Sequence, residues 1–129
     1  MKKVLVDSSV WINYFKSKNL HNDLTELIMN NQICTNNLIL SELIPSLKMK
    51  KEDTIIDLLL EIPKKEIDIN WDLIINIQIQ NLKNGVNRVG IPDLIILNNV
   101  ISDNLILYSN DKHFRLMNNF INFELYEEK

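Results

Sequence analysis

Short apolar runs that are typical of buried strands alternate along this chain with longer segments of helical spacing. Strand-type runs occupy residues 4–6, 33–35 and 105–108, and each is followed by a segment with the apolar spacing of a helix or by a turn that leads into one. Parallel strands need a long crossover connection, usually a helix, so this alternation favours a parallel sheet. We therefore expect an α/β fold with helices on both faces of a central sheet.

The helical segments are marked by apolar spacing and by their start and stop residues. Pro45 lies inside one of them and is expected to kink that helix or divide it in two, because proline lacks the backbone N–H. Residues 66–69 alternate as a half-buried strand would, and residues 123–126 are expected to form a last edge strand. Helices are predicted over residues 8–16, 20–29, 37–49, 52–61, 71–82, 92–102 and 112–117.

Composition limits the class of protein. The chain has 129 residues, 46% hydrophobic and 24% charged, with only two glycines and three prolines, which predicts a single domain over residues 1–129. Cys34 is the only cysteine, so neither an internal disulfide nor a thiolate zinc site is expected, and a reducing, cytoplasmic location is the default. The apolar start is interrupted by Asp7, so we expect neither a signal peptide nor a membrane span.

The net charge of -3 argues against a broadly basic nucleic-acid-binding protein. That objection weakens if several acids are gathered in a metal site, because bound cations reverse the local sign of the field that a phosphate meets. The lysines at positions 48, 50, 51, 64 and 65, and Arg88, Lys112 and Arg115, are more simply explained as solvated side chains than as RNA contacts.

Three carboxylates lie at the start of a predicted helix, and each has an ordinary structural explanation. Asp7 follows the first strand and Asp111 follows the run 105–108, so both can cap the next helix. Asp93 follows Pro92 in the first turn of a helix, where the helix dipole favours a negative charge. None of the three indicates a functional site by itself.

Glu42 lies in a segment that is otherwise nearly all apolar. Its helical neighbours include Leu38, Ile39 and Met49, so a buried, partnered or metal-bound carboxylate is expected. The alternative is an exposed edge near Lys48.

The common location of these acids changes the interpretation. In an open parallel sheet, ligands bind outside the carboxyl ends of the strands, and helices that follow parallel strands begin at that edge. Four carboxylates in one cleft repel one another by a few kcal/mol per close pair at an effective dielectric constant near 20, unless a cation lies between them. An all-oxygen ligand set favours Mg²⁺ or Mn²⁺, and such a site suits phosphate chemistry with a metal-activated water.

Four short motifs in this order resemble those of the PIN-domain family, and in particular the VapC toxins. They are Val4-Leu5-Val6-Asp7-Ser8-Ser9-Val10-Trp11-Ile12, Ile39-Leu40-Ser41-Glu42-Leu43, Gly90-Ile91-Pro92-Asp93-Leu94-Ile95-Ile96 and Ser109-Asn110-Asp111-Lys112-His113-Phe114. Together they span nearly the whole chain. Asn98-Asn99 departs from the family, which often has small apolar residues there.

The resemblance implies a three-layer α/β/α fold with a parallel sheet of four to five strands and an acidic groove that binds Mg²⁺ or Mn²⁺. It implies that Asp7, Glu42, Asp93 and Asp111 bind the metal and catalyse RNA cleavage, with Ser8 and Ser109 holding a carboxylate or a metal-bound water. It also implies a homodimer and a VapB-like antitoxin whose tail can place a basic side chain in the groove. No substrate-binding residues are predicted.

Two other enzyme and signalling classes also place an Asp after the first strand, and the sequence lacks their further acids. An aspartate-nucleophile phosphatase needs a second Asp two residues after the first, and Ser9 stands there. A phospho-receiver domain needs a pair of acids beside the first strand, which is not evident. A catalytically silent PIN-fold module that binds RNA or protein, and a non-toxin RNA-processing nuclease, remain the alternatives. His113 is expected to be a surface histidine, because residues i and i+2 of a helix lie on different faces.

Overall fold

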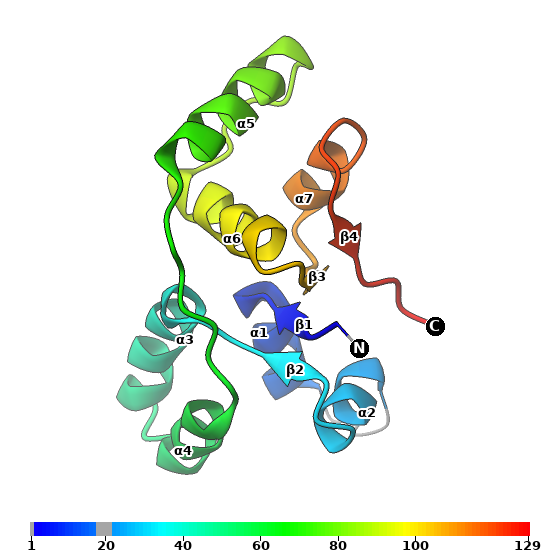
Figure 1. Cartoon of the computed structure of the whole chain (residues 1–129). Coiled ribbons are helices and arrows are strands. Elements are labelled where there is room, and N and C mark those ends of the chain that lie inside the picture. Colours follow the sequence, from blue (N-terminus) through cyan, green and yellow to red (C-terminus); the bar gives the residue numbers. More distant parts are fainter. Residues whose placement is uncertain (1, 18–21) are drawn as a thin grey trace.

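Four strands form one parallel sheet at the centre of the computed structural model, which describes residues 2–17 and 22–129 (Figure 1). The strands are β1 (Val4–Val6), β2 (Ile33–Cys34), β3 (Ile106–Tyr108) and β4 (Glu124–Leu125), in the order β2-β1-β3-β4. All three neighbouring pairs are parallel. The expected α/β fold with a parallel sheet is confirmed, and the predicted edge strand at 123–126 is β4.

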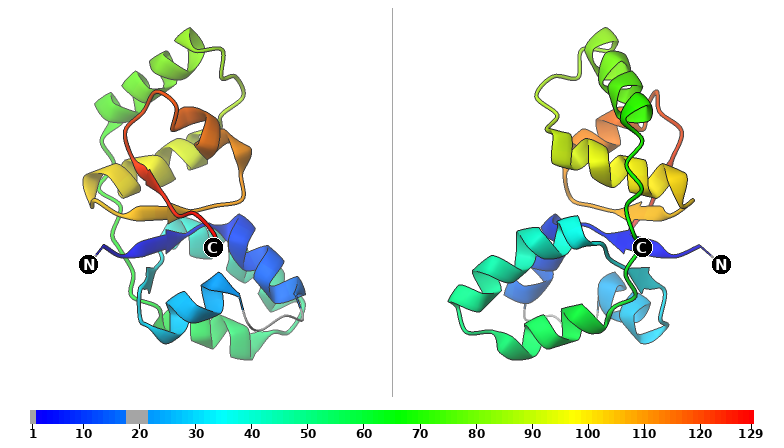
Figure 2. Two further views of the ribbon diagram at one scale, coloured as in Figure 1. Left: turned by 90° about the vertical axis from the view of Figure 1, so that its right-hand side faces the viewer. Right: turned by 60° about the vertical axis from the view of Figure 1, so that its left-hand side comes forward.

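Helices cover the sheet on both faces. The chain moves from β1 to β2 in one direction and from β2 past β1 to β3 and β4 in the other. α3 contacts α1 and lies with α4 on the side of the strands that α1 and α2 occupy, and the chain then crosses to α6 on the opposite side. Figure 2 shows α6 and α7 on one side of the strands and α1 and α2 on the other. The helices are α1 (Ser8–Lys16), α2 (Asp23–Met29), α3 (Asn37–Met49), α4 (Asp53–Glu61), α5 (Trp71–Lys83), α6 (Ile91–Ser102) and α7 (Lys112–Met117).

The helix predicted over 20–29 corresponds to α2, and Leu20 lies outside the described residues. Asn22 caps α2, since its side chain accepts a hydrogen bond from the backbone N–H of Thr25. Pro45 lies inside α3, which continues to Met49 as one helix, so of the kink or division expected at Pro45 the division does not occur. Pro45 is exposed, where water can bond the carbonyl that lacks its partner.

Residues 66–69 do not form the predicted strand. The chain pairs with the sheet edge slightly earlier: the N–H of Thr35 donates to the carbonyl of Pro63 (3.0 Å), and the N–H of Lys65 donates to the carbonyl of Thr35 (2.8 Å). Only an isolated bridge between Thr35 and Lys64 results, because β2 is too short to continue the ladder. The alternating pattern at 66–69 therefore marks an extended segment, and the prediction of a strand there was wrong.

Two buried asparagines of α6 take the place of that missing ladder. The Asn98 side chain accepts from the N–H of Asn70 (2.8 Å) and donates to the carbonyl of Asp68 (3.1 Å). Asn99 accepts from Asn36 Nδ2 (2.9 Å) and donates to Asp103 Oδ2 (2.8 Å). Asn99 Nδ2 also lies 3.5 Å from the carbonyl of Glu66, so the pair Asn98-Asn99 fastens the extended segment to α6, which an apolar pair could not do.

Replacing Asn98 by alanine is expected to lower the free energy of unfolding by about 1–3 kcal/mol, because two part-buried backbone groups lose their hydrogen-bond partner. Urea denaturation measures this difference. Asn76→Ala is the matched control, since Asn76 is exposed on α5 and its loss is expected to cost less than about 0.5 kcal/mol. Equal stability of the two variants would contradict the role given to Asn98.

Candidate metal site at the carboxyl edge of the sheet

The register of β1 and β3 places Asp7 beside the segment that follows β3. Val6 is paired with Tyr108, and the N–H of Asp7 donates to the carbonyl of Tyr108 (2.9 Å), so the ladder extends one residue beyond β1. Asp7 and Ser109 consequently leave the sheet side by side at its carboxyl edge. This is the edge at which open parallel sheets bind ligands.

Asp7 is buried, with 5% of its surface exposed, and three donors satisfy its carboxylate. Oδ1 accepts from the backbone N–H of Ser8 (2.9 Å), which makes Asp7 the N-cap of α1. Oδ2 accepts from the hydroxyl groups of Ser9 (2.9 Å) and Ser109 (2.8 Å). A buried carboxylate held in this way keeps one orientation, with room on its oxygens for a further partner.

The two hydroxyl groups also bind the loop between β3 and α7. The N–H of Asn110 donates to Ser9 Oγ (3.0 Å), and the N–H of Asp111 donates to Ser109 Oγ (3.0 Å). Ser109 therefore contacts Asp7, as a residue supporting the site would. Ser8, which the sequence suggested for the same task, contacts Asp7 through its backbone N–H, whereas the neighbouring Ser9 supplies the hydroxyl group.

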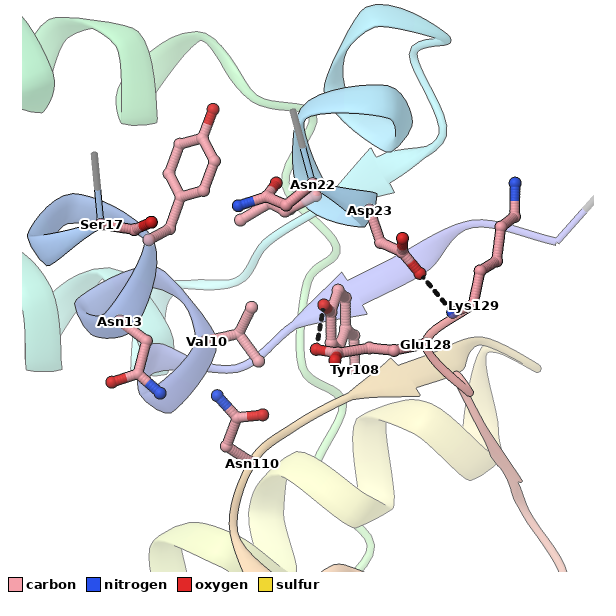
Figure 3. A pocket seen from close by; sticks show the side chains of 11 residues that line it. Val10, Asn13, Ser17, Asn22, Asp23, Tyr108, Asn110, Glu128 and Lys129 are labelled. Carbon is pink, nitrogen blue, oxygen red and sulfur yellow. Dashed lines mark hydrogen bonds between the residues drawn. The ribbon is translucent and has the colours of Figure 1, made fainter. Parts of the chain in front are cut away.

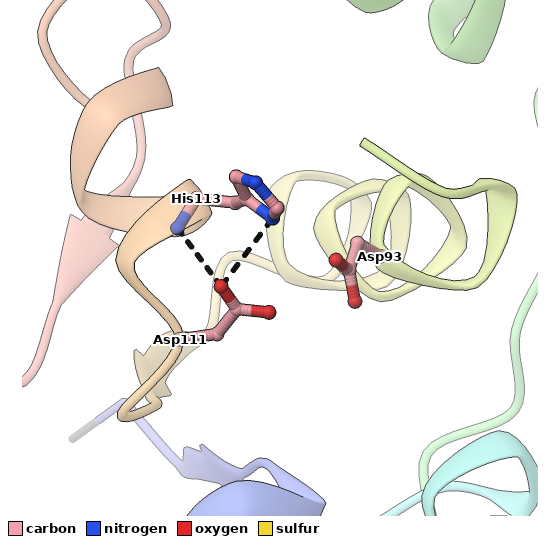
Figure 4. Close-up of side chains that lie close together, drawn as sticks. All are labelled: Asp93, Asp111 and His113. Atoms are coloured by element: carbon pink, nitrogen blue, oxygen red, sulfur yellow. Dashed lines mark hydrogen bonds and ion pairs between the residues drawn. The ribbon is translucent and has the colours of Figure 1, made fainter. Parts of the chain in front are cut away.

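Asp93 and Asp111 come together from different elements, and His113 joins them (Figure 4). One potential ligand atom from each of these three residues lies within 4.8 Å of the others. Asp93 is in the first turn of α6, and Asp111 is the N-cap of α7, accepting from the N–H of His113 (2.9 Å). Asp111 thus caps α7 and Asp93 lies in the first turn of α6, as expected, and these two acids lie close together.

His113 lies closer to the acids than the sequence indicated. Its Nδ1 is 3.4 Å from Asp111 Oδ1, and its side chain is about a quarter exposed. The prediction of an unrelated surface histidine assumed that residues 111 and 113 both lie within a helix. Because Asp111 is instead the extended N-cap, its side chain turns back over the first turn of α7 and reaches residue 113.

Glu42 lies on an exposed position of α3, and the burial expected from its apolar neighbours is wrong. The side of α3 that carries Glu42 faces away from the core, since Ser41, Pro45 and Met49 are exposed as well. Lys48 does not pair with Glu42, because it donates to Asp53 (3.0 Å). Partial burial, with added repulsion from Asp7 and Asp93, raises the pKa of Glu42.

Repulsion between like charges connects all four acids. Burial raises the pKa of Asp93 to about 6, and the charges of Asp111 and Asp7 contribute to the increase, while His113 acts in the opposite direction. Among the described residues, no lysine or arginine forms an ion pair with any of the four. The structure therefore brings together carboxylates whose negative charge is not neutralised by any described lysine or arginine. A bound metal cation would neutralise this charge.

A separate hollow of about 420 Å³ lies beside α1 and α2, where the end of the chain crosses the strands (Figure 3). Its lining includes Asn13 and Asn110. The hydroxyl group of Tyr108 donates to Glu128 (2.6 Å), and the N–H of Lys129 donates to Asp23 (2.8 Å), so the C-terminal residues are held against α2. The acids of the metal cluster are not among the residues that line it.

Among the described residues, no helix has the length and apolar character needed to cross a membrane.

Comparison with known proteins supports the resemblance seen in the motifs. A chain of the DNA-bound VapBC from Salmonella typhimurium is 17% identical, with a TM-score of 0.78 over 98% of each chain. A chain of VapBC-5 from Mycobacterium tuberculosis is also 17% identical, with a TM-score of 0.72 over 98% of this chain and 99% of that one. A chain of a DNA-bound VapBC from Rickettsia felis is 18% identical, with a TM-score of 0.72 over 96% and 98% of the two chains.

At these identities the structural likeness establishes the fold. No curated protein sequence matches the chain. The family model of the PIN domain matches residues 4–119, which include all four acids. The chain therefore belongs to the PIN-domain family.

Proposed function

We propose that the chain is a metal-dependent endoribonuclease that cleaves RNA with a metal-activated water. The observation that carries this proposal is the meeting of Asp93 and Asp111 within 4.8 Å, with no lysine or arginine of the described residues to neutralise them. The charge of Asp7 helps to raise the pKa of both Glu42 and Asp93, and the charge of Asp93 helps to raise that of Glu42. Carboxylate oxygens are the ligands that Mg²⁺ and Mn²⁺ prefer.

The state of Asp93 fits such a cation. No hydrogen bond to its carboxylate is formed within the described part of the chain, and its pKa is raised to about 6, so its ionised form is less favoured than that of an ordinary aspartate unless a positive partner binds. When bound, Mg²⁺ or Mn²⁺ supplies a water of lowered pKa and offsets the charge of the phosphodiester. Asp7, Glu42, Asp93 and Asp111 are the groups proposed to hold it.

The serines around Asp7 would keep that carboxylate in a productive orientation. Ser9 and Ser109 each donate to Asp7 Oδ2 and accept an N–H of the loop that carries Asp111. They therefore fix two of the acids relative to each other. The side chain of Ser8 was predicted to have the same role, and that remains a prediction.

Comparison of two adjacent serines tests this arrangement. Ser9→Ala is expected to reduce both the Mn²⁺ affinity and the RNA cleavage rate by roughly tenfold or more, because groups that orient metal ligands typically contribute this much. Ser8→Ala removes a hydroxyl group and keeps the N–H bond to Asp7, so a much smaller effect is expected. The reverse order would assign the positioning role to Ser8.

We also propose that the protein is the toxin of a type II toxin–antitoxin system, acting in the cytoplasm as a homodimer with a VapB-like antitoxin. The likeness to VapBC-5 supports this, since that protein is described as a member of a family of toxin–antitoxin systems and is matched over nearly the full length of both chains. The acidic cluster would receive a basic side chain of the antitoxin. Expression of the chain alone should arrest growth, and a short neighbouring gene should relieve the arrest.

Two other functions would give different results. A non-toxin RNA-processing nuclease would cleave RNA without arresting growth, and a silent PIN-fold module would bind RNA or protein without cleaving. The deciding experiment incubates the purified chain with total RNA and Mg²⁺, Mn²⁺ or a chelator. Cleavage with either metal and none with the chelator is expected, and equal cleavage in the presence of the chelator would overturn the proposal.

A further inference from the structure

Three side chains from two helices surround one small space between α6 and α7 (Figure 4). Asp93 reaches this space from the first turn of α6, Asp111 from the N-cap of α7, and His113 from the first turn of α7. The first two are acids that are proposed to hold the metal ion. His113 is different, because it offers a ring nitrogen where the acids offer carboxylate oxygens.

The distances between these atoms suit ligands of a single ion. One potential ligand atom of each residue lies within 4.8 Å of the other two, and Nδ1 of His113 is 3.4 Å from Oδ1 of Asp111. An octahedral ion with bonds of about 2.1 Å needs adjacent ligands about 3.0 Å apart and opposite ligands about 4.2 Å apart. Movements of less than about 1 Å would therefore bring all three atoms onto one ion.

An ion pair that only positions Asp111 is the simpler explanation of the contact with His113. The distance of 3.4 Å is longer than an N–H···O hydrogen bond usually is. Oδ1 of Asp111 already accepts from the backbone N–H of His113 (2.9 Å), so the capping bond holds this acid without help from the ring. Within the described residues, the ring of His113 forms no hydrogen bond that would direct its nitrogen elsewhere.

The ring of His113 is held in place before any ion binds. Its side chain is only 26% exposed, whereas Lys112 and Arg115 on the same helix are exposed to solvent. The next residue, Phe114, is fully buried and anchors α7 in the core. A ligand that is already ordered costs little conformational entropy when it binds a metal ion.

We propose that Nδ1 of His113 is a ligand of the ion bound by Asp93 and Asp111, and that this nitrogen makes the site prefer Mn²⁺ to Mg²⁺. The inference rests on the proposed function and names the ion within it. Mg²⁺ is a hard cation that takes oxygen ligands, whereas imidazole is a good ligand of divalent transition metals. A set of carboxylates with one imidazole therefore discriminates between two ions that both suit carboxylates alone.

The charge of the site fits a nitrogen ligand as well. Repulsion already connects the four acids, since the charges of Asp7 and Asp111 help to raise the pKa of Asp93. Imidazole binds metals in its neutral form. His113 therefore adds a ligand without adding a further negative charge to this repulsion.

Pulsed electron paramagnetic resonance of the Mn²⁺-loaded protein tests the proposal directly, because the electron spin of Mn²⁺ couples to a coordinated nitrogen. Isotopic labelling of histidine nitrogen separates this coupling from that of other nitrogens. We expect the coupling in the wild type and its loss in His113→Gln. His21→Gln is the control, because it removes the only other histidine of the sequence and should leave the coupling unchanged. Far-UV circular dichroism checks that both variants are folded.

Competition between the two ions tests the preference. His113→Gln should weaken Mn²⁺ binding by about tenfold or more, because even groups that only orient a metal ligand contribute this much. Its Mg²⁺ affinity should change much less. His113→Asp exchanges the nitrogen for a carboxylate oxygen, so it should still bind Mn²⁺ and should lose the preference over Mg²⁺. The measurement is the Mg²⁺ concentration that releases half of the bound Mn²⁺.

Three outcomes would overturn the proposal. They are bound Mn²⁺ without coupling to histidine nitrogen, a coupling that survives in His113→Gln, and a loss of Mn²⁺ and Mg²⁺ affinity in equal proportion, as a residue that only positions Asp111 would cause. Each of these leaves metal-dependent RNA cleavage intact, so the nuclease proposal would stand. A wild type that binds no Mn²⁺ would overturn this inference together with the proposed metal site.

Discussion

Asp7→Asn is expected to reduce RNA cleavage by at least about a hundredfold while leaving the chain folded. A group that only orients a metal ligand contributes 10–100-fold, and Asp7 is proposed as a ligand itself, so its loss should cost at least the upper part of that range. The cleavage rate is measured on total RNA in saturating Mg²⁺ or Mn²⁺. Growth arrest on expression of the chain should be lost in parallel.

The fold should survive because asparagine keeps the carbonyl oxygen that accepts from the Ser8 N–H. The hydroxyl groups of Ser9 and Ser109 can rotate to accept from the new amide group, so the buried position stays hydrogen-bonded. Thermal unfolding followed by circular dichroism checks this point. If the folded variant cleaves RNA as fast as the wild type, Asp7 has no part in the reaction.

Asp93→Asn is expected to act in opposite directions on the metal-free and the metal-bound protein. Without metal, it removes a partly buried charge next to Asp111 and Asp7, so the variant should be more stable by about 1 kcal/mol after allowance for partial exposure, or roughly 4 °C in Tm. With Mn²⁺ at a hundred times its dissociation constant, the wild type should gain about 2.7 kcal/mol, and the variant should gain little.

The stabilising effect of Asp93→Asn should depend on pH. The folded chain holds the Asp93 proton up to a pKa of about 6, whereas the unfolded chain releases it near the ordinary aspartate pKa of 3.8. Between these values the folded state binds more protons, so ionisation of Asp93 lowers wild-type stability as the pH rises. The difference in Tm between variant and wild type should be close to zero near pH 4 and complete above pH 6.

Asp57→Asn provides the control for both effects. Asp57 is an exposed acid of α4 outside the cluster, so its replacement should change neither the metal-free Tm nor the stabilisation by Mn²⁺. If Asp93→Asn lowers the metal-free Tm, or if Mn²⁺ stabilises it as much as it stabilises the wild type, the carboxylates do not repel each other around a cation site.

The sheet and most of the helices could be predicted from local pattern. Val4–Val6 and Ile106–Tyr108 are short, continuous apolar runs, and such runs are buried in parallel sheets whatever the details of packing. Residues 66–69 show the limit of this reasoning. Their alternation is real, but the partner strand β2 ends at Cys34, and the side chains of Asn98 and Asn99 satisfy the backbone instead. Nothing local to 66–69 reveals that substitution.

The proximity of Asp93 and Asp111 was predictable because strand ends and helix starts share one edge of the sheet. Which side chain faces which could not be predicted. Ser8 and Ser9 look equivalent in the sequence, and only the first turn of α1 decides that the hydroxyl of Ser9 contacts Asp7. The proximity of His113 to Asp111 was not predicted, because Asp111 is the extended N-cap of α7 and not a residue within the helix. The exposure of Glu42 was not predictable either, because it depends on which elements pack against α3.

The central claim is that the four carboxylates form a binding site for a divalent cation. Titration of Mn²⁺ into the metal-free protein at pH 7.5, followed by the electron paramagnetic resonance signal of free Mn²⁺, tests it most directly. The predicted result is saturable loss of the free signal with at least one ion bound per chain, and no such loss with Asp93→Asn. A wild-type protein that leaves the free Mn²⁺ signal unchanged would contradict the claim.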